Sequence, residues 1–197
     1  QYWSLEEEVW MGKVVVWNLM SLDGYFEGAR KWDLDFHLLV WGPELEALSK
    51  EIGGKAEALV FGRVTYEGMK AYWTTTEDET EIKTFMNALP KLVGSRTLET
   101  ADWNNSRVVT DVAAELKRLK QASDKNIYIF GSAELVASLL PDGVIDEIMV
   151  CVVPVLLGQG TPLFKPADER TSLKLLESRP LQSGGVILRY QTEKSAA

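Results

Sequence analysis

The sequence is poor in the residues that build covalent or metal-linked sites, since it has one cysteine, Cys151, and one histidine, His37. A single cysteine cannot form an intramolecular disulfide, which fits a reducing compartment. Because Cys151 stands inside the apolar run 148–153, we expect a buried structural thiol. Zinc sites draw on several Cys and His ligands at short spacing, so the sequence predicts no metal centre.

Long apolar runs are also absent. No stretch reaches roughly 18 apolar residues, so we expect no membrane span, and the chain starts without the basic and apolar segments of a secretory signal. We therefore expect a cytoplasmic protein. The formal net charge is -8, from 21 Lys and Arg against 29 Asp and Glu. Such a chain has no general attraction to nucleic acid or anionic lipid, so a few placed arginines and backbone donors must hold any anionic ligand.

What is present is typical of a folded globular chain: 46% of the 197 residues are hydrophobic and 25% are charged. We expect a single domain over residues 11–195, preceded by an acidic N-terminal extension over residues 1–10. Apolar runs alternate with helical patterns, which predicts an α/β fold with a mostly parallel sheet and helices on both faces. The runs 173–175 and 186–190, joined across a glycine-rich turn, predict an antiparallel hairpin at the C-terminal end.

The expected strands cover residues 14–20, 58–61, 91–95, 107–109, 126–130 and 147–153. Pro43 is placed to open a helix that the Gly53-Gly54 pair stops, and Asp111 is placed to cap another. A third helix begins near Arg63, and a short one around Phe85 ends at Leu89-Pro90. Ser132 is the expected N-cap of a helix over residues 133–140.

The segment Leu59–Glu67 carries the clearest chemical signal, because a buried strand ends in Gly62-Arg63-x-Thr65 and turns into a helix. Free backbone N–H groups and the positive end of the helix dipole favour a phosphate at such a turn. A cation in the first helical turn is unfavourable by roughly 0.3–1 kcal/mol, so Arg63 points to an anion nearby. The alternative is an arginine solvated at a strand end.

Several further motifs follow in a fixed order: Ser21-Leu22-Asp23-Gly24-Tyr25, the Gly62 turn, Ser95-Arg96-Thr97-Leu98, Gly131-Ser132-Ala133-Glu134-Leu135, Ile145-Asp146-Glu147 and Pro154–Phe164. From about residue 11 to residue 190 this series closely resembles the stand-alone members of the RibD C-terminal family. The resemblance implies a three-layer α/β/α fold like that of dihydrofolate reductase. It also implies an NADPH site across the carboxyl ends of the strands.

The resemblance further implies the role of each matching residue. The first turn would hold the pyrophosphate and the 2'-phosphate, through Gly62, Arg63 and Thr65. The second loop would contact phosphate and ribose, through Ser95, Arg96 and Thr97. The third turn would pack against the pyrophosphate, through Gly131, Ser132, Glu134 and Leu135. The loop over the nicotinamide would contain Asp23 and Gly24.

The catalytic residues are less constrained by the pattern. Asp35 and His37 are candidates for a proton-delivering pair, with a solvated aspartate and a packing histidine as the alternative. Trp32, Trp41 and Trp73 are candidates for the wall of a flat-ligand pocket, with core or interface packing as the default.

Taken together, the sequence predicts an NADPH-dependent reductase that transfers hydride to a small heterocyclic substrate of pyrimidine or pteridine type, riboflavin- or folate-related. The resemblance implies an activity like that of 5-amino-6-(5-phosphoribosylamino)uracil reductase or of dihydrofolate reductase. The resemblance implies a homodimer. The alternative is a non-catalytic NADP(H)-binding module or sensor that retains the fold.

Overall fold

The computed structural model describes residues 11–78 and 80–193. The predicted extension over residues 1–10 lies outside the described residues. The main strands are β1 (Val14–Ser21), β3 (Ala56–Gly62), β4 (Lys91–Gly94), β5 (Ser106–Val109), β6 (Asn126–Phe130), β7 (Glu147–Val153), β9 (Leu173–Pro180) and β10 (Val186–Thr192).

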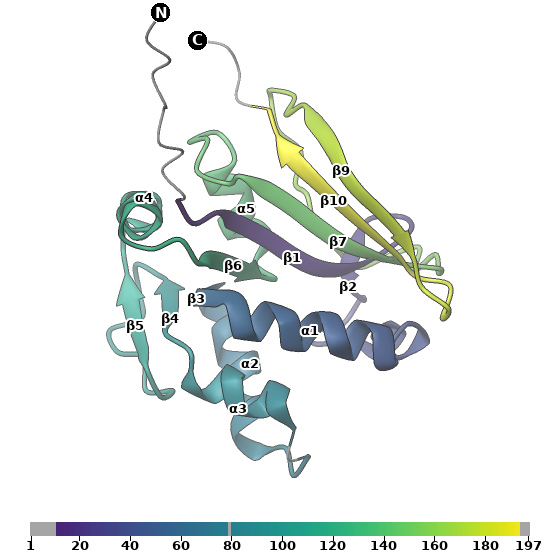
Figure 1. The fold of residues 1–197 in the computed structure, drawn as a ribbon, viewed down its shortest axis with the longest axis horizontal. Helices are drawn as coiled ribbons and strands as arrows, with labels where there is room; N and C mark the ends of the chain where they lie inside the picture. The colour runs from purple at the N-terminus through teal and green to yellow at the C-terminus, as the bar shows by residue number, and fades with distance from the viewer. Residues whose placement is uncertain (1–10, 79, 194–197) are drawn as a thin grey trace, which may run out of the picture.

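These strands form one sheet in the order β5-β4-β3-β6-β1-β7-β10-β9 (Figure 1). From β5 to β7 neighbouring strands run parallel, whereas β10 pairs antiparallel with both β7 and β9. The expected mixed, mostly parallel sheet with a C-terminal antiparallel hairpin is therefore confirmed. Because β6 returns between β3 and β1, the carboxyl ends of these three strands lie side by side.

Two apolar cores lie on opposite faces of the sheet. Successive side chains of a strand alternate between faces, so Val14 and Val16 join one core and Val15 and Trp17 join the other. Trp17 is 5% exposed, as expected for a core position. The core of Val15 is covered by α1 (Pro43–Lys55), α2 (Arg63–Thr75) and α3 (Glu81–Ala88), and the core of Val14 by α4 (Val112–Ala122) and α5 (Ala133–Leu139). The result is the expected three-layer α/β/α arrangement (Figure 1).

The helix boundaries follow local chemistry. Pro43 is the first residue of α1, and the Asp111 carboxylate accepts the N–H of Ala114 at 3.0 Å to cap α4. The expectation that Gly53-Gly54 ends α1 is wrong, because the helix continues to Lys55. A Cβ on Gly53 would lie 2.3 Å from the ring of Phe85. Glycine is therefore needed for the close packing of α3 on α1, and not for a stop.

Three short elements have no counterpart in the expected pattern. Strands β2 (Tyr25–Glu27) and β8 (Thr161–Pro162) pair antiparallel in a small second sheet, and η1 (Asp35–Leu39) is a 3-10 helix. Segments of two to five residues are too short to show a hydrophobic period.

Cys151 is fully buried in β7, as expected, and burial raises the pKa of its thiol to about 11. Among the described helices, none combines the length and the hydropathy that a bilayer crossing needs.

Lys91, the first residue of β4, is an unusual core residue because its side chain is 0% exposed. Its Nζ donates to the carbonyl of Leu89 at 2.7 Å and to that of Asn87 at 3.3 Å. It also lies 4.5 Å from the ring centre of Trp103. Burial lowers the pKa of Lys91 from 10.5 to about 8.

This lowered pKa predicts a pH-dependent stability. Between pH 8 and 10.5 the unfolded chain keeps a proton on Lys91 that the folded protein has released. The free energy of unfolding should therefore rise with pH across this window. Denaturant unfolding from pH 7.5 to 10 should show a steeper rise for the wild type than for Lys91→Met. Lys117→Met, on the exposed side of α4, should keep the wild-type slope; equal slopes in all three proteins would contradict the prediction.

Candidate functional site

A cleft of about 2170 Å³ opens along the carboxyl ends of β1, β3, β4 and β6. The carboxyl ends of parallel strands meet at one edge of a sheet, so the turns that follow them become neighbours. The cleft is lined by Gly62–Thr65, by Ser95 and Arg96, and by Gly131–Leu135. The structure therefore brings most of the sequence-predicted cofactor residues into one cavity.

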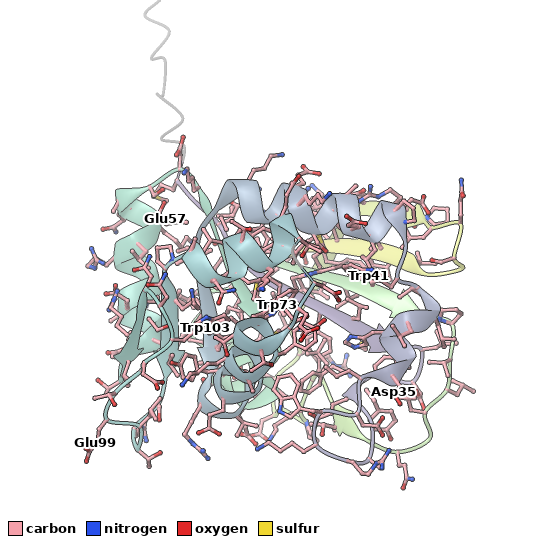
Figure 2. All side chains as sticks on the ribbon, turned by 90° about the horizontal axis from the view of Figure 1, so that it is seen from below. Asp35, Trp41, Glu57, Trp73, Glu99 and Trp103 are labelled. Atoms are coloured by element: carbon pink, nitrogen blue, oxygen red, sulfur yellow. The ribbon has the colours of Figure 1, made fainter. Side chains whose placement is uncertain are left out.

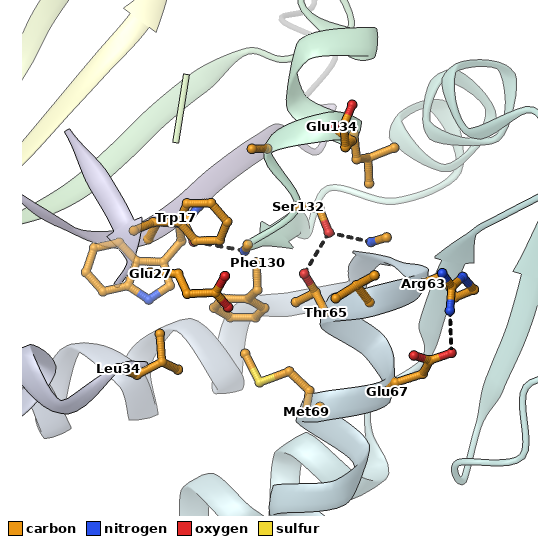
Figure 3. A pocket seen from close by; sticks show the side chains of 18 of the residues that line it. Trp17, Glu27, Leu34, Arg63, Thr65, Glu67, Met69, Phe130, Ser132 and Glu134 are labelled. Atoms are coloured by element: carbon orange, nitrogen blue, oxygen red, sulfur yellow. Dashed lines mark hydrogen bonds and ion pairs between the residues drawn. The ribbon is translucent and has the colours of Figure 1, made fainter. Parts of the chain in front are cut away.

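Ser132 joins two of these turns. Its Oγ accepts the backbone N–H of Gly62 at 2.6 Å and donates to Thr65 Oγ1 at 3.0 Å (Figure 3). Ser132 is the N-cap residue of α5, as expected, but it lies at φ 58° and its side chain makes no cap hydrogen bond. The hydroxyl instead holds the end of β3 against the end of β6.

Two glycines make this junction possible. A Cβ on Gly62 would lie 2.7 Å from Ser132 Oγ, and one on Gly131 would lie 2.8 Å from Thr65 Cγ2. Gly131 also has a φ of 59°, a conformation that glycine adopts at little cost. The close approach of the two turns therefore explains both glycines without reference to a ligand.

Asn18, on β1, is a cleft residue that sequence reasoning does not single out. Its Oδ1 accepts the backbone N–H of Gly131 at 2.8 Å, while its Nδ2 is buried and has no hydrogen-bond partner. The residue is 8% exposed. A polar side chain inside the apolar run 14–20 is the signal that could have found it. Buried amide donors are rarely left unpaired, so Nδ2 is a candidate contact for a ligand.

The N-terminus of α2 lines the cleft with groups that can bind an anion. Its N-cap, Gly62, has no side chain to satisfy the first-turn N–H groups. Arg63 pairs with Glu67 at 2.9 Å, and both side chains are nearly half exposed. An exposed pair of this spacing contributes only about 0.3–0.5 kcal/mol, so Arg63 can exchange Glu67 for an anionic ligand at small cost.

The second predicted loop is only partly inside the cleft. Ser95 and Arg96 line it, and within the described chain the exposed Arg96 has no hydrogen-bond or ion-pair partner. Thr97 is not among the described lining residues. Ser95 Oγ accepts the N–H groups of Thr97 and Leu98 at 3.2 and 3.0 Å, which fixes the turn. In the third turn, Glu134 forms an ion pair with Lys165 beside Leu135.

Asp23 and Gly24 are not among the described residues that line the cleft. The Asp23 carboxylate accepts the N–H groups of Leu157 and Gly158 at 3.1 and 2.8 Å and the hydroxyl of Ser21 at 2.6 Å. These hydrogen bonds, with that from Ser21 the largest, lower the pKa of Asp23. Asp23 therefore ties the turn after β1 to the loop after β7.

The other end of the cleft, which we call the aromatic end, lies between η1, α1, α3 and the later turns of α2. The three predicted tryptophans, Trp32, Trp41 and Trp73, all line it. Figure 2 views the side of the molecule that carries α1 to α3 and labels Trp41, Trp73 and Asp35 there. Figure 3 shows Glu27 and Leu34 on one side of Thr65, with Arg63 and Glu67 on the other. The aromatic residues that line the cleft are Trp17, Phe26, Trp32, Trp41, Tyr72, Trp73, Phe85 and Phe130.

Trp32 lies in the loop before η1, and its side chain packs against helix α2. It lies at φ 64°, and the Glu27 carboxylate accepts its backbone N–H at 2.8 Å. A Cβ on Gly68 would lie 1.6 Å from the indole ring, so the ring rests directly on the backbone of α2. Glu27 and Gly68 together therefore set the position of Trp32, and sequence reasoning identifies neither.

Asp35 and His37 both line the aromatic end. Burial lowers the pKa of His37 to about 4, although its hydrogen bond to the backbone of Phe26 acts in the opposite direction. Its Nε2 is buried without a hydrogen-bond partner. Asp35 is exposed, and in the described chain no hydrogen bond or ion pair joins it to His37. At pH 7 His37 is therefore neutral and has no second proton to give.

The contact between Trp32 and Gly68 can be tested with Gly68→Ala. The new methyl group must displace the indole, whereas alanine favours the helix by roughly 0.5–1 kcal/mol. We expect the free energy of unfolding to change by less than about 1 kcal/mol, with tryptophan emission shifted to longer wavelength. The same substitution in a Trp32→Phe background should give no shift. An unchanged spectrum in the single variant would contradict the contact.

The protonation of the His37 ring can be followed directly by NMR, since it is the single histidine of the chain. We expect its ring proton NMR signals to stay constant from pH 8 to about 5.5 and to titrate with a midpoint near 4. The unfolded chain binds this proton already near pH 6.5, so the free energy of unfolding should fall as the pH decreases from 6.5 to 4. A midpoint near 6.5 would show that the ring is solvated.

Comparison with known proteins identifies the family of this chain. The RibD C-terminal domain model matches residues 12–187. The YyaP protein of Bacillus subtilis (strain 168) is 26% identical over 181 residues, which cover 90% of this chain and 94% of that protein.

Solved structures share the fold. A putative riboflavin biosynthesis protein from Shewanella sp. PV-4 has a TM-score of 0.75 at 20% identity, over 92% of this chain and 99% of that one. Acinetobacter baumannii RibD has a TM-score of 0.68 at 19% identity, over 94% of this chain but 59% of its own. Dihydrofolate reductase from Enterococcus faecalis, complexed with NADP(H), has a TM-score of 0.63 at 14% identity, over 93% and 98% of the two chains. With most of its length matched by the family model, the chain belongs to the RibD C-terminal domain family.

Proposed function

We propose that this protein is an NADPH-dependent reductase that transfers hydride to a small heterocyclic substrate of pyrimidine or pteridine type. The observation that carries the proposal is the arrangement at the start of α2. An uncapped helix N-terminus, Arg63 and Arg96 all face the cleft that opens at the carboxyl ends of the parallel strands. Helix N-termini and arginines are the groups that bind phosphates in proteins.

The residues present fit this cofactor. The first-turn N–H groups of α2 have no side-chain cap, Arg96 has no partner in the described chain, and Asn18 Nδ2 is buried without an acceptor. Each of these donors gains a partner when a phosphate or a carboxamide approaches. The planar guanidinium of Arg63 or Arg96 can bond two oxygens of a 2'-phosphate at once.

We assign the predicted residues accordingly. The phosphate groups would be held at the α2 and β4 turns by Gly62, Arg63, Thr65, Ser95 and Arg96. Thr97 would act through the hydrogen bond from its N–H to Ser95 Oγ. The β6 turn would form the wall beside the pyrophosphate through Gly131, Ser132, Glu134 and Leu135. Asp23 and Gly24 would act at a distance, by fixing the loop after β1 against residues 157–158.

Bound NADPH would supply the hydride, and the residues of this chain would orient the reactants and exclude water. A cleft of about 2170 Å³ exceeds the 300–1,000 Å³ typical of a pocket for one small ligand, so its volume is large enough for a cofactor together with a substrate. Asp35 and His37 are the candidate catalytic residues at the substrate end. Neutral His37 offers Nε2 there as an acceptor.

The substrate class rests on likeness to relatives, among them a structure described as a pyrimidine reductase-like protein from Corynebacterium diphtheriae. We also propose a cytoplasmic homodimer on the same basis. One observation favours a second function, a non-catalytic NADP(H)-binding module: in the described chain no bond links Asp35 to His37.

Cofactor selectivity tests the proposal. Tryptophan-fluorescence titration should show saturable binding of NADPH in preference to NADH. Arg63→Ala should weaken NADPH binding by about 1–3 kcal/mol, the range for hydrogen bonds to charged groups, and NADH binding much less. Arg118→Ala is a matched control, since it also removes an exposed arginine paired with a glutamate on its own helix.

Three outcomes are informative. Equal losses for both cofactors would remove Arg63 from the 2'-phosphate site. Absence of binding by either cofactor would overturn the reductase proposal. Binding of NADPH without turnover of any pyrimidine, pteridine or quinone would favour the non-catalytic module.

A further inference from the structure

The side chains that line the cleft differ between its two ends. At the end formed by the three predicted turns, glycines, hydroxyl groups and basic side chains line the wall together with carboxylates: Arg63, Arg96 and Lys165 with Glu67, Asp111 and Glu134. At the aromatic end, the walls are large rings and aliphatic side chains. Several of these are exposed although they are apolar: Tyr72 is 55% exposed, Trp41 48% and Leu38 76%. Apolar surface that gathers around a cleft marks a binding site, and flat aromatic faces suit a flat ring.

The charges at the aromatic end are mostly negative. The ionisable groups of the described chain that line it, besides His37, are three carboxylates and one lysine: Glu27, Asp35, Asp78 and Lys31. The described lining arginines, Arg63 and Arg96, both belong to the opposite end. A phosphate needs several placed donors with positive charge, and at this end Lys31 is the one basic residue among the described lining residues. The aromatic end is therefore unsuited to a phosphorylated ligand.

Buried polar atoms without partners also belong to residues that line the cleft, and two of these atoms are at the aromatic end. Four such side-chain atoms occur in the described chain, and three of them belong to cleft residues: Asn18 Nδ2, His37 Nε2 and Trp73 Nε1. Trp73 Nε1 is a donor, and Nε2 of the neutral His37 is an acceptor. A buried polar atom left unpaired is costly, and polar atoms on the edge of a bound ring are the kind of partner that these two atoms lack.

We propose that the aromatic end binds a flat ring system that is uncharged or cationic, carries polar atoms on its edge and has no phosphate group. This inference rests on the proposed function for the role of the ring as hydride acceptor, but the binding itself does not require the cofactor. It separates this chain from a reductase that acts on a phosphoribosylated ring.

Two matched pairs of probes test the proposal. Riboflavin and flavin mononucleotide share one ring and differ by a phosphate group. 9-Aminoacridine and acridine-9-carboxylate share another ring and carry opposite charges at pH 7. Binding would be measured by isothermal titration calorimetry, each with and without saturating NADP⁺. We expect riboflavin to bind at least tenfold more tightly than flavin mononucleotide, and the aminoacridine at least tenfold more tightly than the carboxylate.

Variants locate the site. Tyr72→Ala, which removes an exposed ring from the wall, should weaken riboflavin binding at least fivefold, and Trp73→Phe should weaken it by loss of the Nε1 donor. Arg118→Ala, on α4 and outside the described lining of the cleft, should leave riboflavin binding unchanged. Equal or tighter binding of flavin mononucleotide, no effect of Tyr72→Ala, or no binding of either ring would overturn the inference. Ring binding in a protein that binds no NADPH would overturn the proposed function alone.

Discussion

The hydroxyl group of Ser132 is the interaction on which the site depends, because it holds two strand ends in contact that are far apart in the chain. It accepts the N–H of Gly62 and donates to Thr65, so the turn after β6 is bonded directly to the turn after β3. Asn18 extends this connection to β1 through the N–H of Gly131. The glycines leave room for this junction, and the start of α2 stays uncapped at the edge of the cleft.

Beyond this junction the cleft separates two kinds of chemistry along one helix. The first turn of α2 carries Arg63 and N–H groups without a side-chain cap, whereas its later turns carry Gly68, Tyr72 and Trp73. Trp32 rests on α2 between these regions, held by Glu27. A charged ligand group at one end and a flat ring at the other can therefore be bound by the same rigid element, which fits the transfer of hydride between two bound molecules.

The sheet and most helices could be predicted from the sequence, since their apolar periods are long and Asp111 and Pro43 mark boundaries by local chemistry. The pattern misleads where tertiary contacts override local preference. Gly53 signals a helix end but serves packing against Phe85, and Ser132 has the type of an N-cap but bonds to another turn. The site could be predicted from sequence motifs, because the residues of these motifs stand at the ends of strands. Glu27, Gly68 and Asn18 could not be identified, since their roles depend on partners that only folding brings together.

The central claim is that the cleft at the start of α2 binds the phosphate groups of NADP(H). The most direct measurement is the amide NMR spectrum of the 22.1 kDa protein, titrated separately with NADP⁺ and NAD⁺. The account predicts that NADP⁺ shifts the amide signals of Arg63–Thr65, Arg96 and Gly131, and that the two cofactors differ most at the arginines. Shifts confined to residues outside the cleft, or no shifts with either cofactor, would contradict it.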